Sequence, residues 1–208
     1  HFLDNVIDMN KYPLPQTEQL TKGNRKIGLG IMGLADLLIK LGIPYNSDEA
    51  VHFTEKLVSF FSQKANEASI KIAVKRGVFP NHRKSIYAQK NGHGYRNASR
   101  TTIAPTGTIS IIADCSSGIE PLFAIAYKRN VLVEGGLPEI NPFFVETAKK
   151  RGFYSETLIE TISKEGTIQN INEIPEDIKK VFITARDISP EQHVNIQATC
   201  QKYIDSGV

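Results

Sequence analysis

Cysteine is scarce in this sequence, which contains two in 208 residues. Neither Cys115 nor Cys200 has a second cysteine or a histidine near it at the spacing of metal ligands, so the sequence supports no metal site. Cys115 follows Asp114, an acidic neighbour that raises the pKa of a thiol, and Cys200 lies in a predicted helix. We therefore expect two structural thiols, neither of them a nucleophile, and a reducing, cytoplasmic setting.

Long apolar runs are also missing. No stretch approaches the roughly 20 uninterrupted apolar residues of a membrane span, so no membrane partner is expected. Residues His1 to Asp4 provide neither an initiator methionine nor the layout of a secretory signal, and the chain stops at Val208 soon after a predicted helix. We expect residues 1–208 to form part of one larger domain, truncated at both ends.

Acidic residues are absent from Ala68 to Ala113. The same stretch contains eight basic residues, which are Lys71, Lys75, Arg76, Arg83, Lys84, Lys90, Arg96 and Arg100. An acid-free stretch of this length indicates either a bound anion or a solvated basic face, and charge alone favours neither. Nucleic acid is not expected as a partner, because the aromatic residues of the stretch are too sparse for base stacking.

Apolar spacing predicts several helices. A stripe at intervals of three and four predicts a first helix and comprises Ile27, Ile31, Leu34, Leu38 and Leu41. A second, long helix is expected from the capping residue Ser47 to about Arg76. Four more are expected in the last third: Pro142 to Arg151, Glu156 to Lys164, Glu176 to Thr184, and a final helix from Pro190. Ser189 is expected to cap that final helix, with Gln192 placed to close a capping box.

The remaining segments predict few strands. Short strands are expected at Arg100 to Ala104 and at Phe123 to Val131, and an irregular connection is expected from Val78 to Asn97. Composition is that of a globular protein, with 40% hydrophobic and 23% charged residues. Long helices with a few short strands predict an α/β or α+β architecture, of which this chain holds only a part.

Gly28, Gly30 and Gly33 match the spacing of a dinucleotide-binding fingerprint. That fingerprint needs a hydrophobic strand immediately before the glycines, whereas the preceding residues are Thr21 to Lys26. Close packing of a helix against another backbone is the better interpretation, since an interior glycine costs a helix about 1 kcal/mol relative to alanine.

A second motif, Ala104 to Ser110, meets several requirements of a phosphate-binding loop. Pro105 fixes the entry dihedral angle, Gly107 permits an unusual backbone conformation, and a helix is expected to begin near Ile109. The candidate donors are the amides of Gly107, Thr108, Ile109 and Ser110 and the hydroxyls of Thr106, Thr108 and Ser110. Free amides, a helix dipole and acid-free flanks all favour a bound anion, although a capped helix with incidental hydroxyls would have the same sequence.

Two long strings resemble the large subunits of ribonucleotide reductases. They are NRKIGLGIMGLAD at 24–36 and RNASRTTIAPTGTIS at 96–110, the latter followed by CSSGIEPLF at 115–123. The resemblance extends over nearly all of the chain, including Ile188 to Glu191. The sequence TGTIS after Pro105 is most similar to the adenosylcobalamin-dependent branch of the family.

This resemblance implies a ten-stranded α/β barrel with surrounding helices, of which this segment is the predominantly helical part. It also implies reduction of ribonucleotides at the 2′ position through a cysteine thiyl radical, with adenosylcobalamin as cofactor. The partners implied are a ribonucleotide substrate, nucleotide effectors and a thioredoxin-type reductant, and a homodimer is allowed. The residues implied to bind substrate phosphate are Pro105, Thr106, Gly107, Thr108, Ile109 and Ser110.

The chemistry itself is expected outside this segment. In the family, the radical cysteine belongs to an Asn-x-Cys-x-Glu pattern, which neither Cys115 nor Cys200 matches. No catalytic residue is therefore assigned here, and the segment alone is expected to be inactive. Two alternatives remain: a nicotinamide-dependent oxidoreductase using Gly28, Gly30 and Gly33, and a non-enzymatic module that binds an anion through the basic stretch.

Overall fold

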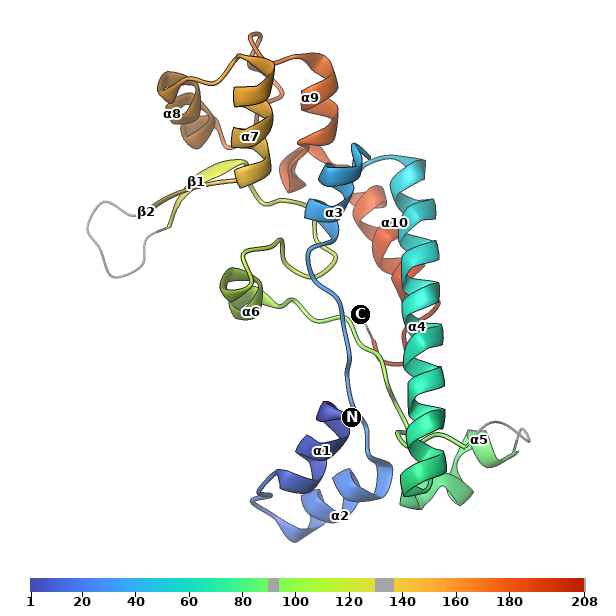
Figure 1. Ribbon diagram of the computed structural model, residues 1–208. Helices are drawn as coiled ribbons and strands as arrows, with labels where there is room; N and C mark the ends of the chain where they lie inside the picture. Colours follow the sequence, from blue (N-terminus) through green and yellow to red (C-terminus); the bar gives the residue numbers. More distant parts are fainter. Residues whose placement is uncertain (90–93, 130–136, 208) are drawn as a thin grey trace. The chain divides into compact units, whose positions relative to one another are not determined.

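The computed structural model describes residues 1–89, 94–129 and 137–207 (Figure 1). Helices predominate, as the sequence predicts. They are α1 (Phe2–Met9), α2 (Pro15–Asn24), α3 (Leu34–Leu41), α4 (Asp48–Arg76), α5 (Ile86–Gln89), α6 (Gly107–Ile112), α7 (Pro142–Arg151), α8 (Glu156–Glu165), α9 (Glu176–Val181) and α10 (Pro190–Gln201), with 3-10 turns η1 (Pro80–Lys84) and η2 (Ala185–Asp187). In the described part of the chain, no helix combines the length and the apolar character that crossing a membrane requires.

The chain folds as two compact units. The first unit comprises His1–Gly30, Thr54–Ala104 and the residues from Ala198 onward. The second unit comprises Ile31–Phe53 and Pro105–Gln197. The loop predicted to bind phosphate lies in the second unit from Pro105 onward, together with helix α3.

Most of the predicted helices are confirmed, and their ends follow local capping. Helix α4 starts after Ser47, whose Oγ accepts a hydrogen bond from the amide of Ala50 at 3.1 Å. Helices α7, α8 and α10 lie where the sequence predicts them. Helix α9 ends at Val181, before the expected Thr184, because the backbone of Phe182 leaves the helical region.

The capping box predicted for α10 is half correct. The Oγ of Ser189 accepts from the amide of Gln192 at 3.3 Å, as expected for a cap. The side chain of Gln192 does not reach back to Ser189. It donates instead to the carbonyl oxygens of Tyr45 and Ser47, at 3.2 and 3.3 Å. A tertiary contact has replaced the local one, which ties the start of α10 to the segment before α4.

The helix predicted from Ile27 is wrong for its first half. The segment 27–30 is extended in the first unit and runs parallel to 99–102, where Leu29 forms a bridge with Thr101. The amide of Leu29 donates to the carbonyl of Arg100 at 2.8 Å, and Leu29 accepts from the amide of Thr102 at 3.0 Å. Helix α3 begins only at Leu34. The expected strand at Arg100 to Ala104 is correspondingly reduced to this one bridge.

The start of the chain, for which the sequence predicts no element, forms α1 and α2. Pro15 opens α2 at a position where proline is tolerated. The connection from Val78 to Asn97 contains η1 and α5, and its residues 90–93 lie outside the described residues. The strand expected at 123–131 is β1 (Ala126–Arg129), which pairs antiparallel with β2 (Leu137–Ile140); residues 130 and 131 lie outside the described residues.

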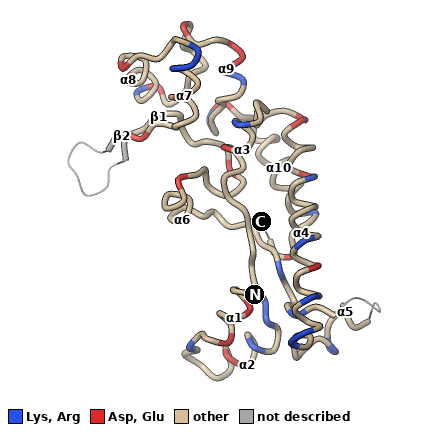
Figure 2. The backbone as a smooth tube through the Cα atoms, in the orientation of Figure 1, with Lys and Arg blue, Asp and Glu red and all other residues tan. Residues whose placement is uncertain are grey.

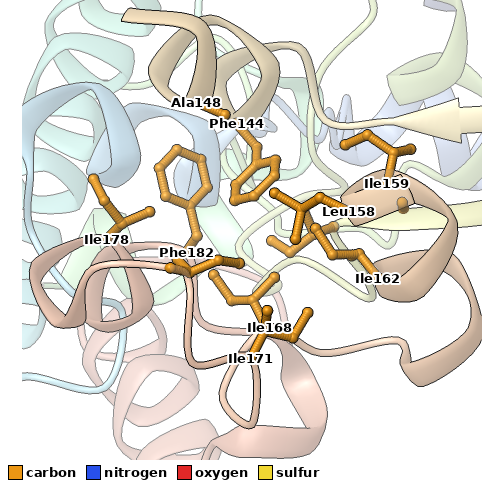
Figure 3. Close-up of a cluster of buried hydrophobic side chains, with 12 residues drawn as sticks. Phe144, Ala148, Leu158, Ile159, Ile162, Ile168, Ile171, Ile178 and Phe182 are labelled. Atoms are coloured by element: carbon orange, nitrogen blue, oxygen red, sulfur yellow. The ribbon is translucent and has the colours of Figure 1, made fainter. Parts of the chain in front are cut away.

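The core of the second unit is apolar (Figure 3). Helices α7, α8 and α9 and the turns that follow them bury side chains that include Phe144, Leu158, Ile162, Ile168 and Phe182. The rings of Phe144 and Phe182 meet edge to face, with centroids 5.4 Å apart. Each large side chain buried here contributes about 1.5 to 3 kcal/mol. This core supports β1, and Lys40 of α3 lies over the ring of Phe143 at 4.5 Å.

The first unit is organised around a buried carboxylate. Asp4 of α1 is fully buried and accepts hydrogen bonds from Arg25 at 2.8 Å, Arg76 at 3.1 Å, Arg96 at 3.2 Å and Asn97 at 3.2 Å. Figure 2 shows acidic positions on α1 and basic positions toward the C-terminal end of α4. Burial works to raise the pKa of Asp4, but the hydrogen bonds and charges of Arg25 and Arg96 outweigh it and hold the pKa below its ordinary value.

Replacing Asp4 should therefore destabilise the first unit. Asp4→Asn leaves several guanidinium groups without their anion, and we expect the free energy of unfolding at neutral pH to fall by about 3 to 5 kcal/mol. The control is Asp8→Asn, since Asp8 also pairs with Arg25 but has a half-exposed side chain; its cost should stay below about 1 kcal/mol. Urea denaturation followed by circular dichroism measures both.

The pH dependence of stability supplies a second measure of the same group. Because the pKa of Asp4 is lowered in the folded state, its contribution is fully present above the unfolded value near pH 4 and is lost as the pH falls through the lower folded value. Asp4→Asn should lack this acid-dependent loss. An equal fall in the free energy of unfolding for Asp4→Asn and Asp8→Asn would contradict a dominant role for Asp4.

Candidate functional site

The loop from Pro105 to Ser110 leads directly into helix α6. Helix α6 begins at Gly107, two residues earlier than expected, with Thr106 as the capping residue. The unusual backbone conformation falls on Thr106, whose φ of 55° is in the left-handed region, and not on Gly107 as the sequence predicted. A β-branched residue rarely adopts this conformation, so the surrounding contacts must hold it there.

Three successive amides at the start of α6 are available to a ligand. Among the described residues, the amides of Gly107, Thr108 and Ile109 have no hydrogen-bond partner, and all three residues are exposed. The prediction that the Ser110 amide is also free is wrong, because it donates to the carbonyl of Thr106 at 2.8 Å. Helix α6 has six residues, so its dipole is small and the individual donors carry the attraction for an anion.

The hydroxyl groups of the loop divide into exposed and internal ones. Thr108 is exposed at the start of the helix, beside the free amides. Ser110 is buried; its hydroxyl donates to the carbonyl of Gly107 at 3.1 Å and lies 3.1 Å from the hydroxyl of Ser117. The hydroxyl of Thr106 accepts from the amide of Gly118 at 2.8 Å. Thr108 therefore faces solvent, whereas Thr106 and Ser110 hold the loop in place.

Residues 115–118 pack behind the loop and form what we call the bracing segment. The amide of Cys115 donates to the carbonyl of Ser110 at 3.0 Å, in addition to the contacts of Ser117 and Gly118 already described. On its other side, the bracing segment bonds to the start of α3: the amide of Gly33 donates to the carbonyl of Ser116 at 2.8 Å. Hydrogen bonds thus connect the loop, the bracing segment and α3 within the second unit.

A cavity of about 300 Å³ lies beside the loop. Ser110 and part of the bracing segment line it, and so do Asp36, Asp114 and Glu120. The expectation of acid-free surroundings is therefore wrong on this side, because α3 and the segment after α6 bring carboxylates close to Ser110. No lysine or arginine occurs between Arg100 and Lys128 in the sequence. Cationic partners of a bound phosphate must come from other parts of the protein.

The two cysteines have the properties of structural thiols. Burial raises the pKa of the Cys115 thiol, and the charges of Asp36 and Asp114 raise it further. Burial alone raises the pKa of Cys200 to about 11. Both thiols are therefore protonated at neutral pH, which removes the nucleophilic form.

The glycines at 28 and 30 pack against a neighbouring chain segment. A Cβ on Gly30 would lie 2.6 Å from the carbonyl oxygen of Thr102, and a Cβ on Gly28 would lie 2.6 Å from the Thr102 side chain. The close approach expected at these glycines exists, but between extended segments and not on a helix. Thr102 occupies the side on which a dinucleotide would have to approach, so the geometry does not support the nicotinamide alternative.

Three arginines of the basic stretch are paired within the first unit. Arg76 and Arg96 bond to Asp4, and Arg100 bonds to Asp205 at 2.6 Å while lying 4.2 Å from the centroid of the Tyr95 ring. Lys90 lies outside the described residues. The sequence left open whether the basic residues bind an anion or form a solvated surface. Arg76, Arg96 and Arg100 instead form ion pairs within the protein.

Comparison with known proteins relates the sequence of this chain to one protein family. The protein family described as ribonucleotide reductase, barrel domain, matches residues 1–208. The vitamin B12-dependent ribonucleoside-diphosphate reductase of Thermoplasma acidophilum is 52% identical over 207 residues, which cover 100% of this chain and 27% of that protein. The protein of the same name from Mycobacterium tuberculosis (strain H37Rv) is 44% identical, covering 100% of this chain and 29% of that protein.

A solved structure shows the same arrangement of elements. The class Id ribonucleotide reductase alpha subunit of Actinobacillus ureae matches with a TM-score of 0.79 and 25% sequence identity, over 98% of this chain and 36% of that one. The chain therefore spans less than a third of the length of the two curated relatives and about a third of this structure.

The glycines give a direct test of the loop geometry. A Cβ on Gly107 would meet no atom within 4 Å, and its φ is not positive, so Gly107→Ala should leave stability unchanged or raise it by up to about 1 kcal/mol. Gly30→Ala drives a Cβ into the Thr102 backbone and should cost about 1 to 3 kcal/mol. Thermal unfolding compares them, and a loss at Gly107 as large as that at Gly30 would refute the described start of α6.

Proposed function

Because the chain belongs to the ribonucleotide reductase barrel-domain family, we propose that it is part of an enzyme that reduces ribonucleotides to 2′-deoxyribonucleotides. Within that enzyme, the loop 105–110 binds the phosphates of the substrate. The substrate class we propose is a ribonucleoside diphosphate, in agreement with the names of the relatives from Thermoplasma acidophilum and Mycobacterium tuberculosis.

The row of three unpaired amides at Gly107, Thr108 and Ile109 is the observation that supports phosphate binding most directly. Successive amides at a helix start point the same way and offer several donors to one group of phosphate oxygens. The exposed hydroxyl of Thr108 adds a fourth donor. Hydrogen bonds from neutral donors to a charged phosphate are stronger than bonds between two neutral groups.

The remaining residues of the loop support these donors. Pro105 fixes the dihedral angle at the entry to the loop. Thr106 and Ser110 hold the loop against the bracing segment through their hydroxyl groups. Substrate binding at the loop would hold the ribose at a fixed distance from the groups that reduce it, which this chain does not supply. A fixed position lowers the entropic part of the barrier.

Adenosylcobalamin is the cofactor we propose for the complete enzyme, on the basis of the relatives' names. When bound, it would supply the radical that starts the reduction. The cavity beside the loop, at about 300 Å³, suits part of a nucleotide and is too small to enclose a corrin ring. A thioredoxin-type reductant, nucleotide effectors, a homodimer and a cytoplasmic location complete the proposal.

Substitution of Thr108 tests the phosphate site. In the complete enzyme, Thr108→Val removes one charge-assisted hydrogen bond of about 1.5 to 3 kcal/mol, so KM for the ribonucleotide should rise by about tenfold or more. The value of kcat should change by less than about threefold, since the bond is made equally in the ground and transition states. Thr161→Val, on the exposed face of α8, is the matched control. Ser110→Ala should raise KM less than Thr108→Val, because the Ser110 hydroxyl is bonded internally. An unchanged KM in Thr108→Val would remove the phosphate role.

Cofactor dependence tests the wider proposal. The complete enzyme should convert ribonucleoside diphosphates to deoxyribonucleotides when adenosylcobalamin and a dithiol reductant are present, and should be inactive without the cobalamin. Product formation is measured by chromatography of the nucleosides. Activity without cobalamin, on addition of a metal-containing radical subunit, would place the protein in another branch of the family.

A further inference from the structure

Asp36 lies in the first turn of α3, outside the loop 105–110, and its hydrogen bonds go to Ser116 of the bracing segment. We propose that Asp36 is a positioning residue for substrate binding: it fixes the bracing segment, and the bracing segment fixes the free amides of the loop. This inference rests on the phosphate role proposed for that loop.

Asp36 and Ser116 are joined by two reciprocal hydrogen bonds. The amide of Ser116 donates to Oδ2 of Asp36 at 2.6 Å, and the amide of Asp36 donates to the hydroxyl of Ser116 at 3.3 Å. Asp36 is 9% exposed, so water competes little for its carboxylate. The first of these bonds is charge-assisted and short, which makes it the strongest contact of the bracing segment.

Other contacts at the start of α3 align the same segment. The amides of Gly33 and Leu34 donate to the carbonyl groups of Ser116 and Gly118, at 2.8 and 3.3 Å. With Asp36, the first turn of α3 therefore makes four hydrogen bonds to residues 116–118. Three of these bonds use amides at the helix start that have no partner within the helix, and the Asp36 charge is favourable at that end of the helix.

The bracing segment passes this alignment to the loop. Gly118 donates its amide to the hydroxyl of Thr106 at 2.8 Å, and the hydroxyls of Ser117 and Ser110 lie 3.1 Å apart. Thr106 is the residue with the left-handed backbone, and it immediately precedes the free amides. If the bond from Gly118 is lost, Thr106 can relax toward an ordinary conformation, which turns the following amides away from a common target.

The proposed role depends on hydrogen-bond geometry and not on negative charge. An asparagine at position 36 can still accept from the Ser116 amide through its side-chain oxygen, whereas an alanine cannot. A carboxylate that acted on the substrate or held a cation would lose its function in both variants. The two substitutions therefore separate positioning from direct participation.

The test uses the complete enzyme with ribonucleoside diphosphate as the varied substrate. In Asp36→Ala, we expect KM to rise by about tenfold or more while kcat changes by less than about threefold, because the loop is displaced but the reducing groups are not. In Asp36→Asn, KM should stay within about threefold of the parent value. Glu160→Ala, an exposed position on α8, is the control and should leave both constants unchanged.

A double-variant cycle tests the route of the effect. If Asp36 acts through the bond from Gly118 to Thr106, the double variant Asp36→Ala, Thr106→Ala should have a KM within about twofold of the larger single effect. Should Asp36→Ala fail to fold, Ser116→Ala and Thr106→Ala carry the same test, since each removes one bond of the chain and should raise KM with kcat preserved.

Several outcomes would overturn the proposal. The first is an unchanged KM in Asp36→Ala or, where that variant does not fold, in both Ser116→Ala and Thr106→Ala. The second is a rise of KM in Asp36→Asn equal to that in Asp36→Ala. The third is a KM in the double variant that equals the product of the two single effects. Thr108→Val separates this inference from the function on which it rests. If Thr108→Val raises KM and Asp36→Ala does not, the positioning role alone fails; if neither raises KM, the phosphate site fails as well.

Discussion

The reciprocal hydrogen bonds between Asp36 and Ser116 join residues 80 positions apart and fix the bracing segment, which in turn bonds to the loop 105–110. They attach the bracing segment to a helix whose apolar face is already buried in the second unit. The bracing segment in turn supports Thr106 in a backbone conformation that threonine rarely adopts. The free amides of the loop are thus held in position by a network of tertiary hydrogen bonds. The loop sequence alone would not be sufficient to hold them there.

A buried carboxylate has a comparable structural role in the first unit. Asp4 collects donors from α4, from the residue after α2, and from the chain around Arg96, which lie far apart in the sequence. In both units an acid near the start of a helix bonds to donors on a distant segment. Arg76 and Arg96, which belong to the basic stretch that the sequence leaves open as a possible anion site, are used here for internal pairing with Asp4.

The sequence predicts those parts of the fold that depend on neighbours along the chain. The caps at Ser47 and Ser189 and the limits of α7 and α8 are confirmed, because capping and helical periodicity act within one or two turns. The expectation of a largely helical part of the reductase barrel is confirmed by the family and structural matches. The helix expected from Ile27 is wrong because pairing of 27–30 with 99–102 outweighs an apolar stripe that is compatible with both conformations.

By itself, the sequence determined the family, the place of the loop and the kinds of donor it contains, since these depend on which residues follow one another. The tertiary structure decided which donors are available: Thr108 and three amides face solvent, while Ser110 is turned inward. The tertiary structure also placed carboxylates beside the loop, although the sequence from Ala68 to Ala113 contains no acidic residue. It brought Asp36 to its hydrogen-bond partner Ser116. Such pairings depend on how the chain closes over long separations, and spacing along the sequence carries no signal for them.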